Sequence, residues 1–263
     1  MMIAPFAAFD SARFDRLRRD RGVRFGQPLT VLATTGSTND DAFEAAKNGA
    51  AEGALFVAEE QTAGRGRRGR SWTSPPGENL TFSLLLRPEL PADRVSAVSL
   101  LVGLAVRAAA ARRVPESVAL KWPNDVVVGP RKLAGILVES RVTGARVDAV
   151  VVGVGLNVHF RELPDELRGI ATSLAALGDP LPDREAALTD VLAELEPRLG
   201  VFIDRGLAGL LPELRAHDAL AGVPIGVSGI RGEGAGIDGD GSLLIKDGAG
   251  EIQRVSSGTV ERL

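Results

Sequence analysis

The sequence predicts an α+β fold of 263 residues, with a large domain at residues 1–218 and a small C-terminal β-barrel at residues 219–263. The length exceeds one average domain of about 150 residues and falls short of two. Several β-rich pieces follow one another between helical stretches, as in an α+β arrangement. From residue 222 to 258, 11 of 37 residues are glycine, spaced between short β-prone pieces, which is typical of a small barrel.

Local signals define each expected element. A helix is expected to begin at Ser37 or Thr38, which can act as its N-cap before two aspartates, and to end near Lys47. Helical patterning also covers residues 9–20, 92–113, 184–205 and 207–217. Strands are expected at residues 29–33, 54–59, 79–87, 118–122, 125–128, 132–141 and 147–158, and in the C-terminal part at 223–227, 242–246 and 251–255. Residues 129–131 form a tight connection, which predicts a hairpin.

Composition excludes several classes of protein. The chain has no cysteine, and its two histidines, His159 and His217, are too far apart for a local metal motif, so no thiol or protein-ligated metal chemistry is expected. The net charge of -3 and the few aromatic residues argue against wrapping of nucleic acid. Asp10 and Arg13 interrupt any N-terminal signal sequence, and Arg107 interrupts the longest apolar stretch, residues 95–111. We therefore expect a cytoplasmic protein, with that stretch as a buried helix.

A loop rich in glycine and arginine is the most distinctive local feature. The segment Gly64-Arg65-Gly66-Arg67-Arg68-Gly69-Arg70 combines glycines, which let backbone N–H groups approach a ligand, with forked cationic donors suited to phosphate or carboxylate. A solvated charged loop is the alternative. The segment also matches a dinucleotide fingerprint, but Pro75 and Pro76 follow where that motif needs a helix. No P-loop is present, because no glycine precedes a lysine directly.

Two further clusters are candidates for binding. Lysine is scarce, at four against 27 arginines, yet Lys121 and Lys132 lie on neighbouring expected strands. Lys121 opens the segment Lys121-Trp122-Pro123-Asn124-Asp125, which alternatively only closes a turn. Gly153 and Gly155, two residues before Asn157, would let a flat ligand lie against a strand, although a bulge explains them equally well.

In this order, the blocks resemble those of bacterial biotin protein ligases. The matching blocks are Gly36-Ser37-Thr38-Asn39, residues 61–70 with Trp72, residues 121–125, residues 131–139 (RKLAGILVE) and residues 153–157. The resemblance covers about residues 30–260 and implies a class II synthetase-like fold, with a mixed, largely antiparallel central sheet flanked by helices and an SH3-like C-terminal barrel. It also implies that ATP converts biotin into biotinoyl-5'-AMP, which then modifies a lysine of a biotin carboxyl carrier domain of an acyl-CoA carboxylase.

The resemblance also implies a role for each matching residue. Catalysis would depend on Lys132, Arg67, Asp125 and Lys121, with Asp125 helping to deprotonate the acceptor amine. Biotin would be bound by Ser37, Thr38, Asn39, Gln61, Gly64, Arg65, Gly66, Arg67, Lys132, Gly135 and Leu137. ATP would be bound by Arg67, Arg70, Trp72, Lys121, Asn124 and Asn157, with Mg²⁺ carried by the phosphates and not by a protein metal site.

The chain departs from the family pattern in two places. Only 36 residues precede Ser37, so we expect a short form without the N-terminal DNA-binding domain of some relatives, a monomer or weak homodimer that binds neither DNA nor membrane. In some relatives an aromatic residue after the Gly-x-Gly-x-Asn block packs on adenine, but residues 169–174 contain none, which makes Trp72 a possible substitute. A lipoate ligase or octanoyl transferase of the same fold, a nucleic-acid-binding module and a scaffold protein are the alternative functions.

Overall fold

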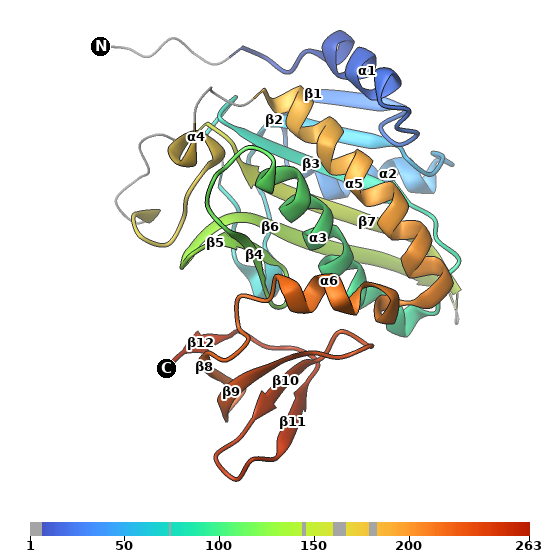
Figure 1. Cartoon of the computed structure of the whole chain (residues 1–263). Helices are drawn as coiled ribbons and strands as arrows, with labels where there is room; N and C mark the ends of the chain where they lie inside the picture. Colours follow the sequence, from blue (N-terminus) through green and yellow to red (C-terminus); the bar gives the residue numbers. More distant parts are fainter. Residues whose placement is uncertain (1–6, 74, 144–145, 160–166, 179–182) are drawn as a thin grey trace.

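A seven-stranded sheet forms the centre of the molecule (Figure 1). The computed structural model describes residues 7–73, 75–143, 146–159, 167–178 and 183–263. Across the sheet the strands are β1 (Leu29–Thr35), β2 (Leu55–Gln61), β3 (Asn79–Leu86), β7 (Arg146–Asn157), β6 (Arg131–Thr143), β5 (Asp125–Val128) and β4 (Val118–Lys121). Strands β1 and β2 are parallel, and the other neighbouring pairs are antiparallel. The expected mixed, largely antiparallel sheet is confirmed.

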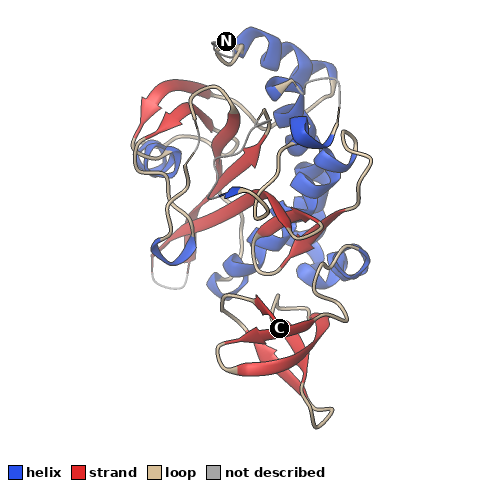
Figure 2. Ribbon diagram, turned by 90° about the vertical axis from the view of Figure 1, so that its left-hand side faces the viewer, coloured by secondary structure: helices blue, strands red, loops and turns tan. Residues whose placement is uncertain are grey.

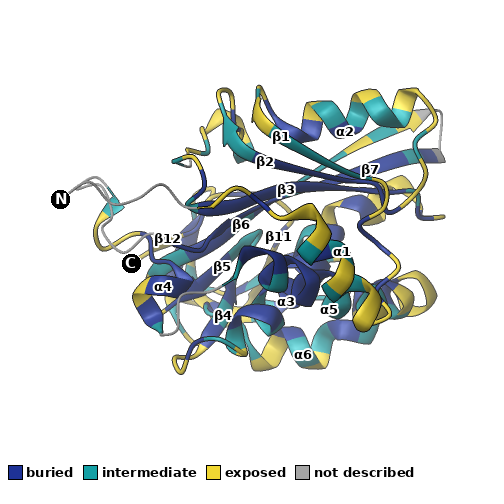
Figure 3. Ribbon diagram, turned by 90° about the horizontal axis from the view of Figure 1, so that it is seen from above, coloured by how far each residue is buried: buried dark blue, intermediate teal, exposed yellow. Residues whose placement is uncertain are grey.

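Helices cover both faces of this sheet, unequally. Helices α1 (Ser11–Asp20), α3 (Val98–Ala111), α5 (Arg184–Arg205) and α6 (Leu211–Ala216) lie on one face, whereas α2 (Thr38–Lys47) lies on the other (Figure 3). The short helix α4 (Leu174–Leu177) comes after β7 in the chain. Helix α2 covers only part of its face, next to β2, β3 and β7. Beyond α2, the indole of Trp72 lies against Gly135 of β6 and Gly155 of β7.

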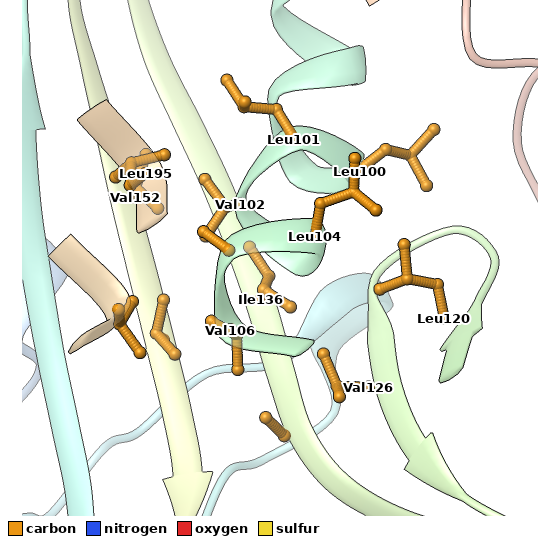
Figure 4. Packing of buried hydrophobic residues seen from close by; sticks show 14 of the residues in the cluster. Leu100, Leu101, Val102, Leu104, Val106, Leu120, Val126, Ile136, Val152 and Leu195 are labelled. Carbon is orange, nitrogen blue, oxygen red and sulfur yellow. The ribbon is translucent and has the colours of Figure 1, made fainter. Parts of the chain in front are cut away.

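The apolar stretch around residues 95–111 is a core helix, as expected. A 3₁₀ turn at Ala92–Ala97 leads into α3, whose leucines and valines pack against Ile136 and Val152 of the sheet and Leu195 of α5 (Figure 4). The stretch Ala92–Ala111 is long and apolar enough to cross a membrane by length and composition, but 67% of its most apolar window is buried in the protein. Small side chains let α3 approach the sheet closely, since a methyl group at Gly103 would lie 2.9 Å from Leu120.

Two helices differ in detail from expectation. Helix α2 has the expected bounds and Ser37 at its N-cap, but the Ser37 side chain makes no capping hydrogen bond. Residues 207–217 were expected to form one helix and instead form a 3₁₀ turn, Leu207–Leu210, followed by α6. Pro212 lies in the first turn of α6, where the missing N–H of proline costs no helical hydrogen bond, and it therefore favours a new helix beginning there. Proline does not always end a helix in this protein, because Pro197 lies inside α5.

The C-terminal part is a five-stranded antiparallel sheet, consistent with the expected SH3-like unit (Figure 2). Its strands, in order across the sheet, are β11 (Ile252–Val255), β10 (Leu243–Lys246), β9 (Ile230–Ile237), β8 (Pro224–Val227) and β12 (Glu261–Arg262). The buried Trp122 donates its indole N–H to the Gly241 carbonyl at 2.9 Å, and one hydrophobic cluster contains residues of both sheets. The domain boundary near residue 219 stays a prediction.

Candidate active site

A cavity of about 420 Å³ lies on the open part of the sheet, at the N-terminus of α2. Strands β3, β6 and β7 form its floor, and the loop of residues 64–73, called here the Gly-Arg loop, forms one wall. Most of the residues expected at a site line this cavity: Ser37, Thr38, Asn39, Gln61, Arg65, Gly66, Arg67, Arg70, Trp72, Asn124, Lys132, Gly135, Leu137 and Asn157. Blocks spread over 120 residues of sequence therefore meet in one place.

One end of the cavity is polar, buried and internally hydrogen-bonded. Thr38 and Asn39 are at most 3% exposed although they line the cavity. The Gln61 side-chain oxygen accepts from the Thr38 backbone N–H at 2.8 Å and lies 3.0 Å from the Thr38 hydroxyl. The hydroxyl of Ser83 lies 2.7 Å from that of Thr38 and 2.6 Å from Asn39 Oδ1, and Asn39 donates to Glu139 at 2.6 Å. This end is thus fixed without a ligand.

Glycines in the sheet make room for side chains that lie flat on it. A Cβ atom at Gly153 would lie 2.4 Å from Asn39 Oδ1, and one at Gly155 would lie 2.2 Å from the Trp72 ring. Gly135 on the neighbouring strand is also close to Trp72. The alternate glycines do allow close approach to the strand, but the side chains that approach are the protein's own Asn39 and Trp72. Strand β7 shows no register shift against β3 at either glycine, so a bulge between these strands does not explain them.

The Gly-Arg loop carries the arginines of the cavity. Arg65 forms two hydrogen bonds of 2.7 Å with Asp40 of α2 and lies 3.4 Å from Glu139. The hydrogen bond to Arg65 holds the pKa of Asp40 below its usual value. Arg67 is half-buried and lies 3.5 Å from Asn124 Oδ1, and burial lowers its pKa. At the tip of the loop Arg68 has φ of 57°, a left-handed conformation that is unusual outside glycine.

Lys132 lies between the carboxylate of Asp125 and the indole of Trp72. Its Nζ is 2.7 Å from Asp125 and 5.5 Å from the ring centre of Trp72. Lys121 lies opposite Asp125 in the strand register of the β4–β5 hairpin. Burial lowers the pKa of Lys121, and repulsion from nearby cations lowers it further. Lys121 and Asp125 do not themselves line the cavity, and neither does Gly64, whose carbonyl accepts from the Trp72 N–H at 2.9 Å.

The opposite end of the cavity is aliphatic. Leu167, Ile170 and Ala171 line it, and Ile170 is 59% exposed. Hydrogen bonds between the backbones of Lys132 and of Ile170 and Thr172 attach this segment to β6, and Asn157 donates to the Thr172 carbonyl at 2.9 Å. Trp72, expected near the nucleotide, lies over the sheet glycines, so its contact with adenine stays a prediction.

Sequence reasoning missed several residues of the site. Ser83 and Glu139 were not expected there, and neither was the aliphatic wall. Ser83 in an apolar strand was a usable signal, because a buried polar side chain usually needs a hydrogen-bond partner, which Ser83 finds in Asn39. Within the described residues, no group of three or more His, Cys, Asp or Glu side chains that could hold a metal is found.

Comparisons with known proteins identify the family of the chain. Residues 31–157 match the model of the Biotin/lipoate A/B protein ligase family. A biotin--[acetyl-CoA-carboxylase] ligase of Mycobacterium tuberculosis is 40% identical over 193 residues, 70% of each chain. One of Paracoccus denitrificans is 37% identical, covering 84% of this chain and 95% of that protein. The bifunctional ligase/repressor BirA of Bacillus subtilis is 33% identical, over 90% of this chain and 74% of that protein.

Solved structures give the same result. The biotin protein ligase from Aquifex aeolicus in complex with biotin and ATP superposes with a TM-score of 0.77 at 29% identity, covering 89% of this chain and 98% of that one. Its apo structure superposes with a TM-score of 0.74 at 26% identity, with 89% and 97% covered. The chain therefore belongs to the biotin/lipoate protein ligase family, and within it to the biotin protein ligases.

Proposed function

We propose that this protein activates biotin with ATP as biotinoyl-5'-AMP and transfers the biotinoyl group to a lysine of a carboxyl carrier domain of an acyl-CoA carboxylase. The observation that carries the proposal is a single cavity with a neutral polar end and a cationic wall. A ureido ring suits the first, because hydroxyl and amide groups bind an uncharged cyclic urea without desolvating a charge. A carboxylate that lies next to a triphosphate suits the cationic wall.

In the first step the biotin carboxylate attacks the α-phosphorus of ATP and pyrophosphate leaves. Two anions must approach each other, so cations are needed to offset the repulsion and the charge that develops at phosphorus. Lys132 and Arg67 line the cavity and are our candidates for this role. Lys121 does not line the cavity and lies opposite Asp125 on the neighbouring strand. Mg²⁺ is expected to enter with the triphosphate.

In the second step a lysine amine of the carrier attacks the acyl carbon of the mixed anhydride, and AMP leaves. The amine must lose a proton, and the reference pKa of lysine is about 10.4, so a carboxylate near the reaction assists. Asp125 is the candidate for this proton acceptor. Its ion pair with Lys132, which lines the cavity, holds the carboxylate beside the site. Asn124 and Asn157 are proposed to face the nucleotide.

Direct assay of both steps tests the proposal. The purified protein, given biotin, ATP and Mg²⁺, should release pyrophosphate, and addition of a purified carrier domain should yield biotinylated lysine and AMP. Parallel reactions with lipoate or octanoate test the alternative within the same family. Turnover of lipoate with none of biotin would overturn the assignment, and absence of pyrophosphate with any of these acids would overturn the adenylation chemistry itself. We further propose a cytoplasmic monomer or weak homodimer.

A further inference from the structure

A chain of side-chain contacts leads from Glu139 to the polar end of the cavity. It begins at the Glu139 carboxylate, passes through Asn39 and the buried Ser83, and ends at Thr38 beside Gln61. The contacts are 2.6 to 3.0 Å long, and Ser83 is fully buried. Glu139 itself is 35% exposed and lies outside the lining of the cavity. We call these four residues, Glu139, Asn39, Ser83 and Thr38, the relay.

Proton counting shows that every hydroxyl proton of the relay is used within the protein. An ionised carboxylate only accepts, so Asn39 must turn its NH₂ toward Glu139 and its oxygen toward Ser83. A hydroxyl has one proton, so Ser83 gives its proton to Asn39 and can only accept from Thr38. The Thr38 hydroxyl has one proton and two acceptors within reach, the Ser83 hydroxyl at 2.7 Å and the Gln61 side-chain oxygen at 3.0 Å, so this proton stays within the protein in either case. Gln61 still receives the Thr38 backbone N–H.

The consequence appears at the cavity, where the polar end presents acceptors. The Thr38 hydroxyl donates its proton to Ser83 or to Gln61, so a lone pair that remains free can only accept from a ligand. A ligand group with N–H donors fits this end, whereas a second acceptor would leave buried lone pairs facing each other. If the residue at 139 were neutral and able to donate, Asn39 could turn over, and the whole relay could reverse to present a donor.

We propose that Glu139 is a positioning residue that, through Asn39 and Ser83, orients the polar end of the cavity to accept the N–H groups of the biotin ureido ring. The inference rests on the proposed function, because it names the ligand group that the site recognises. Glu139 acts through another residue and does not touch the ligand. Its second contact, with Arg65, must be separated from the relay, and Asp40 makes that possible because it binds Arg65 and lies outside the relay.

Four variants test the proposal: Glu139→Gln, Ser83→Ala, their combination, and Asp40→Asn. Biotin affinity is measured by calorimetry, ATP affinity and thermal stability are measured alongside, and the full chain is used throughout. Glu139→Gln keeps the shape and can both accept and donate, so biotin should bind about tenfold more weakly, the loss expected for a charge-assisted hydrogen bond. Ser83→Ala should act similarly, and ATP affinity should stay within about twofold in both, because among the described residues the only polar contact of the relay with the Gly-Arg loop is the 3.4 Å contact of Glu139 with Arg65, which Asp40 also holds.

The double variant distinguishes a relay from two separate defects. Glu139 and Ser83 are both bonded to Asn39, so removal of one already disorders the amide, and the double variant should bind biotin about as weakly as the weaker single variant. A purely structural role would instead give losses that multiply and that follow thermal stability. Asp40→Asn measures how much the anchoring of Arg65 contributes to biotin affinity. The loss of biotin affinity in Glu139→Gln must exceed that contribution.

Three results would overturn the inference: biotin affinity of Glu139→Gln within twofold of the wild type, multiplicative losses, or an equal loss in Asp40→Asn. Should Glu139→Gln fail to fold, Ser83→Ala decides, since the relay requires weaker biotin binding at unchanged ATP affinity. A wild-type protein that binds no biotin contradicts the proposed function and not the relay alone. The two failures therefore have different signatures.

Discussion

The two walls of the cavity are built differently. At the polar end, Ser37, Thr38 and Asn39 are at most 4% exposed, and the side chains of Thr38 and Asn39 are hydrogen-bonded to partners from other elements. On the Gly-Arg loop, Arg65 is 39% exposed and its strongest contact is an ion pair with a 61% exposed aspartate. Exposed ion pairs contribute little to stability, typically about 0–1 kcal/mol.

This difference separates recognition of a neutral group from recognition of anions. A neutral hydrogen-bonding pattern must be rigid, because a misplaced donor or acceptor costs affinity without any long-range attraction to compensate. Anions attract cations over a longer distance, so a loop can close on them after they arrive. We therefore expect the polar end to be formed before binding and the cationic wall to complete itself around the ligands. Four predictions follow, from the largest effect to the smallest.

Removal of the central cation should have the largest effect. Lys132→Ala leaves Asp125 facing the reacting anions without its partner, and the rate of pyrophosphate release should fall about 10²–10³-fold, the size typical for loss of a transition-state charge contact. Lys246→Ala is the matched control, because Lys246 lies exposed on the C-terminal sheet. A variant with weakened biotin binding but normal turnover would show that this wall only binds.

A pair of glycine substitutions compares the two walls directly. Gly153→Ala places a methyl group against Asn39, which is held by Ser83 and Glu139, whereas Gly155→Ala places one against Trp72, which is carried by the loop. We expect Gly153→Ala to lower thermal stability by several degrees, since overpacking costs about 1–3 kcal/mol, and to weaken biotin binding about tenfold.

Gly155→Ala should lower the melting temperature by less than about 2 °C, because the loop can move with the indole. The two positions lie on one strand and one face, so the comparison controls for strand propensity. Equal destabilisation by both substitutions would contradict the distinction between a rigid and a loop-borne wall. Thermal melts and biotin titration of the two variants decide the matter.

The cationic wall should also respond to alkaline pH. Burial lowers the pKa of Lys121, so its positive charge is lost, as pH rises, at a lower pH than the usual lysine value of about 10.4. The kcat/KM for ATP should therefore decline on the alkaline side. Lys121→Arg should move that decline to higher pH, because arginine stays protonated. An identical pH profile in the variant would exclude Lys121 from the charge that ATP meets.

Ionic strength should produce the smallest difference. When the salt concentration rises from about 0.05 M to about 0.5 M, the screening length falls to a few ångströms, and the attraction of the loop arginines for anions becomes weaker. The KM for ATP should rise about two- to fivefold. Inhibition by biotinamide, which has the ureido ring but no carboxylate, should change by less than about twofold. Equal salt dependence of both would contradict the assignment of neutral and anionic groups to different walls.

Local patterns predicted much of this protein because their physical causes are local. The start of α2 follows from small polar residues before acidic ones, and the β5–β6 hairpin follows from its short connection. The C-terminal sheet follows from glycine spacing between short strands. Pro212 could have been recognised as a break between two helices. The order of the sequence blocks indicated the family.

The relay and the place of Trp72 could not be predicted in this way. Asn39 meets Ser83 across 44 residues of sequence and Glu139 across 100, and no spacing rule connects such partners. The packing of Trp122 on Gly241, which joins the two sheets, spans 119 residues. These contacts exist only after the strands have been ordered as they are in the sheet.

By itself, the sequence determined which segments become helices and strands and which kinds of side chain are available for chemistry, because propensity, capping and charge act over a few residues. The tertiary structure decided which of these side chains meet, which amide turns which way, and which cations lie inside the cavity and which behind it. The physical reason is that strand order and close packing set distances between residues far apart in the chain, and hydrogen bonds depend on tenths of an ångström.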